Sequence, residues 1–386
     1  MNRTCPICSG RKADPLKKIS MLLQSGNSLP GEYEVVCCEK CGFVYADVNA
    51  SQKLYNDYYE NFNIHTEDLD IKGYDDVIAY ETICEMLEGA GIAKGTRILD
   101  IGSGSGGLLR HLQEQGGYTQ LWGIDPSPRS IERLAERGIN GEVANIFDDV
   151  KEKLKNKFEL AVSTGVIEHI YDLKGYLSQI EKYLQAEKPY ILLLAPDVES
   201  FPGYPTPIPS YFNHEHINYF SKASLDNLMG QRGFYRVGDM RYFYEDEPVL
   251  LGLYRRGDIQ GHFARDEESR AAVEEYFRII EKEGNSREDV LNSLLERKGN
   301  FVVFGSGSYA MQLLADCPRM LDRIEYFVDN NRDKVGMCIA GKQVKSPEEL
   351  HSANRDLAIA ICSMKNSADI KKQLEAMNVL NDVVVL

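Results

Sequence analysis

The chain has 386 residues, enough for two or three domains with sizeable cores. Hydrophobic residues make up 43% and charged residues 27% of it, as in an ordinary globular protein, and the formal net charge is −15 at pH 7. This charge disfavours a nucleic-acid partner, because proteins that bind phosphate backbones carry basic patches. We find neither an apolar run of roughly 18 residues nor a signal-peptide core, so we expect a cytoplasmic protein without a membrane partner.

The first predicted module covers residues 1–50 and contains two Cys-x-x-Cys pairs. The four cysteines are Cys5, Cys8, Cys38 and Cys41. Two such pairs around a hairpin-sized insert match a tetrahedral structural zinc site, which would stabilise a segment with few core residues. Cys37 could replace Cys38 but lacks the spacing, so we interpret it as a packing residue. The alternative is four unrelated reduced cysteines; the odd total of nine disfavours a secreted disulfide framework.

Residues 51–80 are rich in aromatic and acidic side chains, as in LYNDYY at 54–59, and are too irregular to predict a helix. An aromatic segment directly before a ligand-binding core can act as a lid that excludes water. It can equally pack the zinc module onto the core. Both interpretations, linker and lid, remain open at this point.

The stretch TRILDIGSGSGGLLRHLQEQGGYTQLWGIDPS at residues 96–127 is the centre of the sequence. An apolar run at 97–101 precedes a turn of glycine and serine and a helix-like segment, which is the order strand, tight turn, helix. Gly102, Gly104 and Gly106 permit backbone angles closed to other residues. They also let a ligand approach the main chain, where the helix start offers free N–H groups.

A second predicted strand, residues 120–124, ends in Asp125, about 20 residues after the glycines and placed to accept hydrogen bonds from a ribose. The sequence therefore predicts a nucleoside site. The pattern Gly102-x-Gly104-x-x-Gly107 also satisfies the dinucleotide fingerprint. Asp100 favours a different ligand, because an anion beside the turn repels a pyrophosphate but can hold the ammonium of an amino acid.

These residues resemble the class I S-adenosylmethionine (SAM) methyltransferases, whose motif reads acid-x-Gly-x-Gly-x-Gly. Three more motifs follow in the family's order: FELAVS at 158–163 resembles its fourth strand, VIEHI at 166–170 the segment after it, and YILLLAP at 190–196 the fifth strand. The resemblance implies an α/β fold with a Rossmann-like methyltransferase core over residues 81–256 and SAM as cofactor. A nicotinamide-type site is the alternative.

The resemblance also implies the ligand contacts. The residues expected to bind SAM are Asp100, Gly102, Gly104, Gly106, Asp125, Asn145, Ile146, Thr164 and Glu168. Asn145 and Ile146 follow a predicted third strand, where related enzymes contact adenine, although most have an acid at the position of Asn145. Glu168 and His169 often border the methionine end of SAM in these families, and a capping or structural role is the alternative.

The proline-rich segment FPGYPTPIP at 201–209 cannot form a helix or a central strand. It leads to SYFNHEH at 210–216, a loop with several possible proton carriers, and loops are where reactive residues usually lie. The candidate catalytic residues are Tyr211, His214, Glu215 and His216. A purely architectural role of this segment is the alternative. Ser221 or Ser224 is predicted to begin the next helix.

Residues 257–299 are predicted to be two charged amphipathic helices that form a solvated connector, with Val273, Phe277 and Ile280 at helical spacing. Residues 300–386 are predicted to be a second Rossmann-like unit.

In that last unit, FVVFGSGSYAMQLL at 301–314 reads as strand, glycine turn and helix. Gly305, Gly307 and Asp329 suggest a nucleotide-sized crevice, and an empty structural copy is the alternative.

The order of zinc module, SAM core, helical connector and second Rossmann-like unit resembles the three-domain C-methyltransferases of nucleotide-linked keto-deoxysugars. This implies SAM and structural Zn²⁺ as cofactors, a nucleotide-linked sugar as the small-molecule acceptor, and Glu215 and His216 in the active site, with His216 as base. The chain departs from the family at Asn213, where the family has tyrosine, and at residues 305–310, where it lacks an expected lysine-containing motif.

Methylation at carbon and at oxygen both remain open, and the acceptor nucleotide is expected between the core and residues 300–386. The alternatives to this enzyme are a non-catalytic SAM-binding scaffold and, against the acidic charge, an RNA methyltransferase.

Overall fold

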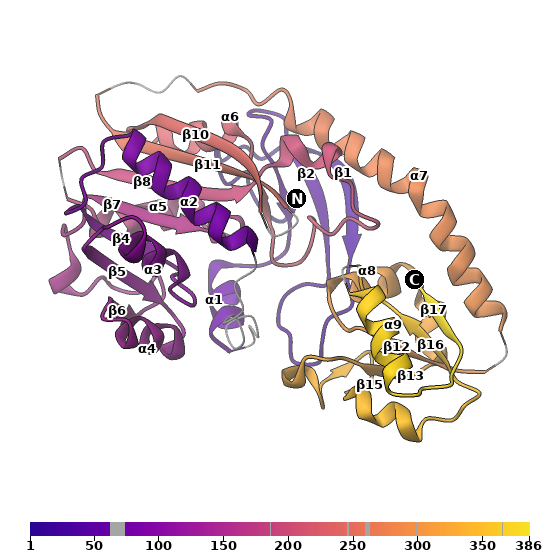
Figure 1. The fold of residues 1–386 in the computed structure, drawn as a ribbon. Helices are drawn as coiled ribbons and strands as arrows, with labels where there is room; N and C mark the ends of the chain where they lie inside the picture. Colours follow the sequence, from indigo (N-terminus) through magenta and orange to yellow (C-terminus); the bar gives the residue numbers. More distant parts are fainter. Residues whose placement is uncertain (62–73, 186, 245–246, 259–262, 298, 365) are drawn as a thin grey trace. The chain divides into compact units, whose positions relative to one another are not determined.

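The computed structural model describes residues 1–61, 74–185, 187–244, 247–258, 263–297, 299–364 and 366–386. The chain divides into two compact units (Figure 1). The first comprises Met1–Leu16, Val35–Tyr204 and Glu215–Val273, and the second comprises Lys17–Glu34, Pro205–His214 and Glu274–Leu386. Within the described part of the chain, no helix combines the length and the apolar character needed to cross a membrane.

The first unit is built on a seven-stranded sheet with the order β10-β11-β8-β7-β4-β5-β6. Its strands are β4 (Arg97–Ile101), β5 (Gln120–Asp125), β6 (Asn140–Val143), β7 (Leu160–Thr164), β8 (Tyr190–Pro196), β10 (Phe234–Tyr244) and β11 (Glu247–Arg256). The strands from β6 to β8 run parallel, and β11 is antiparallel to both of its neighbours. The chain changes direction across the sheet beside β4, and ligands bind at the carboxyl ends of strands at such switch points.

Both faces of this sheet are covered, which explains why its inner strands are apolar at nearly every position. In β8, Leu192 and Leu194 belong to one buried cluster, and Leu193 and Ala195 belong to the other. Helices α2 (Tyr74–Gly89), α3 (Gly107–Glu114) and α4 (Pro128–Glu136) contribute to the first cluster, and α5 (Leu173–Tyr183) and α6 (Lys222–Gly230) to the second. The predicted strands of the SAM core are confirmed to within two residues.

The start of α6 is one of the predicted features. Ser221 is its N-cap, because its side chain accepts a hydrogen bond from the backbone N–H of Ser224. The Ser224 hydroxyl oxygen in turn accepts a hydrogen bond from the backbone N–H of Ser221. This reciprocal pair satisfies N–H groups that a helix start leaves unpaired. The hairpin of β10 and β11 that follows α6 was not predicted.

A smaller sheet has the order β1-β2-β3-β9. Its strands are β1 (Ala13–Ser20), β2 (Glu32–Cys38), β3 (Val44–Asp47) and β9 (Asn218–Tyr219). The irregular segment expected at residues 51–80 begins with a helix, α1 (Gln52–Asn61), and residues 62–73 of the proposed lid lie outside the described residues. Tyr55 and Tyr58 are 1% and 4% exposed, so tertiary packing stabilises a helix that local propensity did not reveal.

The second unit contains a six-stranded sheet with the order β14-β15-β13-β12-β16-β17. Its strands are β12 (Phe301–Phe304), β13 (Ile324–Val328), β14 (Cys338–Ile339), β15 (Lys342–Lys345), β16 (Ala358–Ile361) and β17 (Val383–Val385), with helices α8 (Ser308–Asp316) and α9 (Ser367–Ala376). All neighbouring pairs are parallel except β14 with β15. The strand, glycine turn and helix expected at 301–314 are present.

The prediction of two helices within residues 257–299 is wrong, because α7 (Ser269–Glu296) is one helix of 28 residues. Its single glycine, Gly284, costs only about 1 kcal/mol relative to alanine, which is too little to end a long helix. Val273 is fully buried, and Phe277 and Ile280 are 6% and 7% exposed, so the helix contributes to hydrophobic cores as well as connecting segments.

The glycine turn after β4 offers a matched test of the local packing. Gly106 has φ of +74°, and a Cβ there would lie 2.4 Å from Cδ2 of buried Leu134, whereas Gly104 has φ of +50° with nothing within 4 Å of such a Cβ. We expect Gly106→Ala to lower the free energy of unfolding by about 1–3 kcal/mol more than Gly104→Ala, because it adds overpacking to backbone strain. Urea denaturation measures the difference; equal losses in the two variants would contradict the packing shown here.

Candidate functional site

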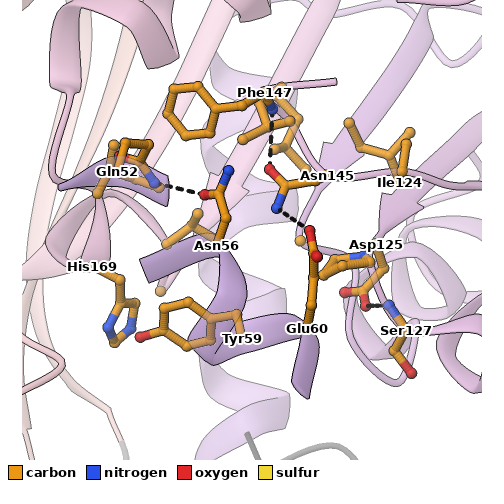
Figure 2. Close-up of a pocket in the computed structure, with 18 of the residues that line it drawn as sticks. Gln52, Asn56, Tyr59, Glu60, Ile124, Asp125, Ser127, Asn145, Phe147 and His169 are labelled. Atoms are coloured by element: carbon orange, nitrogen blue, oxygen red, sulfur yellow. Dashed lines mark hydrogen bonds between the residues drawn. The ribbon is translucent and has the colours of Figure 1, made fainter. Parts of the chain in front are cut away.

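A cavity of about 520 Å³ lies at the carboxyl ends of β4, β5, β6 and β7 (Figure 2). Its volume is within the range of small-molecule sites, roughly 300–1,000 Å³. The segments that follow these four strands form most of the wall, and α1 forms the rest. Of the expected SAM contacts, Gly102, Asp125, Asn145 and Ile146 line this cavity; Asp100, Gly104, Gly106, Thr164 and Glu168 are not among its described lining residues.

Asp125 ends β5 with its carboxylate at the cavity wall. Oδ2 accepts a hydrogen bond from the backbone N–H of Gly104 at 2.9 Å, and Oδ1 accepts one from Ser127 at 2.9 Å. Burial raises the pKa of Asp125, and these two N–H groups oppose that rise. The Ser130 side chain also donates to this carboxylate. Because a carboxylate has about four acceptor sites, the oriented group can still accept a further hydrogen bond from a ribose hydroxyl.

Asp100 lies one residue before the end of β4 and is only 2% exposed. Burial, and secondly the charge of Asp125, raise its pKa to about 7. Its Oδ1 has no hydrogen-bond partner among the described residues. A buried carboxyl without a cation is costly, so this position is suited to a positively charged group of a ligand.

The segment after β6 forms the next part of the wall. Asn145 Nδ2 donates to Glu60 Oε1 at 3.1 Å, and Asn145 Oδ1 accepts from the backbone N–H of Phe147 at 3.1 Å (Figure 2). These bonds hold the amide across the cavity edge. Ala144, Ile146 and Phe147 line the same part of the cavity, so its wall is partly apolar there.

Helix α1 supplies four wall residues that the sequence analysis did not identify: Gln52, Asn56, Tyr59 and Glu60. Positions separated by four, seven and eight residues share one face of a helix, so this spacing was the available signal. It was missed because no helix was predicted there. The Tyr59 hydroxyl is buried without a hydrogen-bond partner among the described residues, and burial raises its pKa well above the usual value, so it remains a neutral donor.

Three titratable side chains lie close together beside the cavity: Glu168 and His169, which follow β7, and His216, which comes from the segment before β9. Glu168 Oε1 lies 3.9 Å from His169 Nε2, and the rings of His169 and His216 have centroids 4.8 Å apart. His169 Nδ1 is 3.1 Å from the carbonyl oxygen of Glu215, which also lines the cavity. Burial raises the pKa of Glu168 to about 8, so this carboxyl is largely protonated at neutral pH.

The four candidate catalytic residues fall into both units. Glu215 and His216 belong to the first, and Tyr211 and His214 to the second. Glu215 Oε1 accepts a hydrogen bond from the Tyr58 hydroxyl at 2.5 Å. Tyr211 is 2% exposed and packs on the ring of Tyr276 at 5.3 Å, which is a core position of the second unit.

Two groups of described residues bring metal-binding side chains together: Cys5, Cys8, Cys38 and Cys41, and Glu168, His169 and His216. In the cysteine group, Sγ atoms of Cys5 and Cys41, and of Cys8 and Cys38, are 3.5 Å apart. Four thiolates around zinc with bonds of about 2.3 Å would have sulfurs about 3.8 Å apart, so the group fits this ion. Cys37 is outside it and contacts the carbonyl of Gly42 at 3.4 Å, in agreement with a packing role.

The raised pKa of Asp100 gives a pH prediction. Its folded-state pKa of about 7 lies above the unfolded value of about 4, so the folded state binds the extra proton and stability falls as pH rises between these values. We expect Asp100→Asn to remove part of this fall, on the order of a few kcal/mol, in thermal unfolding without ligand between pH 4 and 8. The exposed Asp258→Asn serves as control; identical pH profiles for Asp100→Asn and the unmodified protein would reject the assignment.

Residues 78–237 match the family model described as a methyltransferase domain, and residues 297–385 match one described as C2185-like, N-terminal. N-methyltransferase 4 of Papaver somniferum is 26% identical over 126 residues, 31% of this chain and 34% of that protein. Phosphoethanolamine N-methyltransferase 1 of Triticum aestivum is 26% identical over 171 residues, 43% of this chain and 34% of that protein. The chain thus spans about a third of the length of these relatives.

Among solved structures, the chain is similar to 1,6-didemethyltoxoflavin-N1-methyltransferase of Burkholderia thailandensis, with a TM-score of 0.40 and 16% identity over 57% of this chain and 97% of that one. The match of residues 78–237 covers the glycine turn, Asp125 and the strands that form the cavity. Residues 78–237 therefore belong to a methyltransferase domain.

Proposed function

We propose that the protein is a SAM-dependent methyltransferase of a small-molecule acceptor. The observation that carries the proposal is the cavity at the carboxyl ends of β4 to β7, with the Asp125 carboxylate at its wall, within the segment that matches a methyltransferase family. SAM supplies an electrophilic methyl group on a sulfonium. A cationic ligand suits a site with the buried carboxyls Asp100 and Glu168 nearby.

In this proposal the ligand lies across the strand ends. Asp125 accepts hydrogen bonds from the ribose, and the adenine lies beside Asn145 and Ile146. The ammonium of the methionine part lies near Asp100 and Gly102, where it would supply the positive charge that the buried carboxyl lacks. Thr164 and Glu168 would border the methyl end.

For the acceptor we propose a nucleotide-linked sugar, methylated at carbon or oxygen. The second unit has a cavity of about 540 Å³ at the ends of β12, β13 and β16, lined by Gly305, Gly307 and Asp329, which suits the nucleotide part. The relatives named as N-methyltransferases favour an amine as the alternative acceptor. A scaffold without turnover and an RNA methyltransferase are the other readings.

His216 is the proposed general base, with Glu215 beside it in the chain. An acceptor hydroxyl, or a carbon beside a ketone, must lose a proton as it takes the methyl group, and an imidazole has a suitable pKa. The bond from the acceptor to the methyl carbon then forms as the bond from carbon to sulfur breaks. The fixed position of the acceptor supplies much of the acceleration. Tyr211 and His214 remain proposed donors to the acceptor oxygen.

For the cysteine group we propose one structural zinc ion. Its four thiolates would leave no open coordination position, so the ion would stabilise residues 1–50 and take no part in methyl transfer. The other segments keep the roles proposed from the sequence. Residues 51–80 are the linker or lid, residues 81–256 the SAM core, residues 257–299 the connector, and residues 300–386 the C-terminal unit.

Methyl transfer can be tested directly with the full-length protein. We expect SAM and S-adenosylhomocysteine, but not NAD, to bind in titration calorimetry. Incubation with SAM and a panel of nucleotide-linked sugars and small amines should give one product heavier by about 14 Da, the mass of one methyl in place of hydrogen, in mass spectrometry. Binding of SAM without any methylated product would support the scaffold; binding of NAD alone would overturn the proposal.

The base assignment is tested by His216→Asn. We expect turnover to fall roughly 10²-fold or more while SAM affinity stays nearly unchanged, because a base acts only as the proton leaves. His351→Asn, in the second unit, is the matched control and should retain full turnover. Full activity of His216→Asn would exclude the base role.

The zinc assignment is tested by elemental analysis of protein purified without chelator. We expect one zinc per chain, its loss in Cys38→Ser, and its retention in Cys37→Ser, because only Cys38 belongs to the cysteine group. A zinc-free protein with four free thiols at these positions would defeat the assignment.

A further inference from the structure

Arg3 is a buried cation two residues before the first cysteine of the zinc-type group. It is 3% exposed, and a guanidinium carries its charge and five N–H donors in a protein. A buried guanidinium is stable only where acceptors replace the lost water. The acceptors around Arg3 therefore show what this residue holds in place.

The guanidinium donates hydrogen bonds to two separate chain segments. Its acceptors are the carbonyl oxygens of Ile170 at 3.2 Å, Tyr171 at 2.6 Å and Ile217 at 3.1 Å, and Asn218 Oδ1 at 3.0 Å. The first two follow His169 directly, and the last two follow His216 directly. One side chain thus spans the two loops that carry the histidine pair beside the cavity.

Asn218 extends this connection. Its Nδ2 donates to the carbonyl oxygen of Ile170 at 2.7 Å and to that of Ile167 at 3.1 Å. The backbone N–H of Ile217 donates to the carbonyl oxygen of Glu168 at 2.9 Å. The two loops are therefore joined by direct bonds, and Arg3 bonds to both sides of the junction.

The backbone of Arg3 is held in place by the cysteine module, which is the N-terminal segment of residues 1–50 that contains Cys5, Cys8, Cys38 and Cys41. Asp47 Oδ1 accepts hydrogen bonds from the backbone N–H groups of Asn2 at 2.7 Å and Arg3 at 2.6 Å. Asp47 ends β3, and β3 pairs with β9 through Val44 with Tyr219. The position of the guanidinium thus depends on the fold of residues 1–47.

We propose that Arg3 is a positioning residue for methyl transfer, which couples the cysteine module to the relative placement of His169, at the SAM cavity, and His216, the proposed base. This inference rests on the proposed function. The N-terminal module that contains the four cysteines would then contribute to turnover as well as to folding. Arg3 would not contact the ligand, but it would fix the positions of His169 and His216.

Replacement of Arg3 by lysine keeps the charge but loses the planar fork, and one ammonium cannot reach all four acceptors. Misplacement of reacting groups by about 1 Å can cost as much as 10²-fold in rate. We expect Arg3→Lys to lower kcat roughly tenfold or more, with a SAM Kd within about twofold of the original and the zinc content unchanged. The ring signals of His169 and His216 should shift in NMR spectra of the full-length protein.

Arg270→Lys is the matched control. Arg270 Nη1 lies 2.6 Å from Asp14 Oδ2, so it also attaches the N-terminal module, but at β1 rather than at the histidine loops. We expect it to leave kcat and both histidine signals unchanged. An equal loss of kcat in Arg270→Lys would show that general loosening of the module, and not loop placement, is responsible.

A folded Arg3→Lys protein with original kcat and original histidine signals would overturn the inference. Asn218→Ser, which removes an acceptor of Arg3 while keeping the buried charge, should also lower kcat, and original values in this variant would likewise contradict it. If the unmodified protein transfers no methyl group, the proposed function fails, and the histidine signals alone still decide whether Arg3 sets the loop geometry.

Discussion

The carboxyl ends of β4, β5, β6 and β7 meet at one edge of a parallel sheet, and this constraint places most of the candidate site. Each strand delivers a different group to that edge: the glycine turn, Asp125, the segment at Asn145, and the loop of Glu168 and His169. None of these groups is near another in sequence. The backbone hydrogen bond from Gly104 to Asp125 joins the first two and gives the carboxylate a fixed direction.

The electrostatics of this edge favour a cation over a pyrophosphate. Asp100, Asp125 and Glu168 are each less than 10% exposed, and burial raises the pKa of all three. A ligand with an ammonium and a sulfonium would lower the cost of their ionisation, whereas a diphosphate would increase it. The buried carboxyls therefore agree with the preference for an amino-acid ligand over a pyrophosphate that Asp100 indicated in the sequence.

The sequence predicted those parts of the fold that depend on local patterns. The apolar run of β4, the glycine turn and the N-cap of α6 follow from composition and spacing within a few residues, whereas β7 and β8 were expected from the resemblance to the methyltransferase motifs. Helix α1 was missed because its stability comes from buried tyrosines, whose partners lie far away in sequence. The two charged amphipathic stretches of residues 257–299 are continuous in α7, because the single Gly284 between them costs only about 1 kcal/mol and does not end a long helix.

The sequence predicted part of the cavity wall but not all of the residues that line it. Asp125 and Asn145 line the cavity as expected, because the motif fixes their place relative to strand ends. No local sequence pattern encodes how the N-terminal segment packs on the core. This packing determines which residues of α1 line the cavity and which carbonyl oxygens accept hydrogen bonds from Arg3. Tyr211 and His214 are neighbours of His216 in sequence, yet they belong to the other compact unit.

A crystal structure of the full-length protein with S-adenosylhomocysteine would test the central claim most directly. The account predicts the ligand in the cavity at the ends of β4 to β7, with its ribose hydroxyls on Asp125, its base beside Asn145 and Ile146, and its ammonium toward Asp100. Density for the ligand elsewhere, or an empty cavity at saturating ligand, would contradict it.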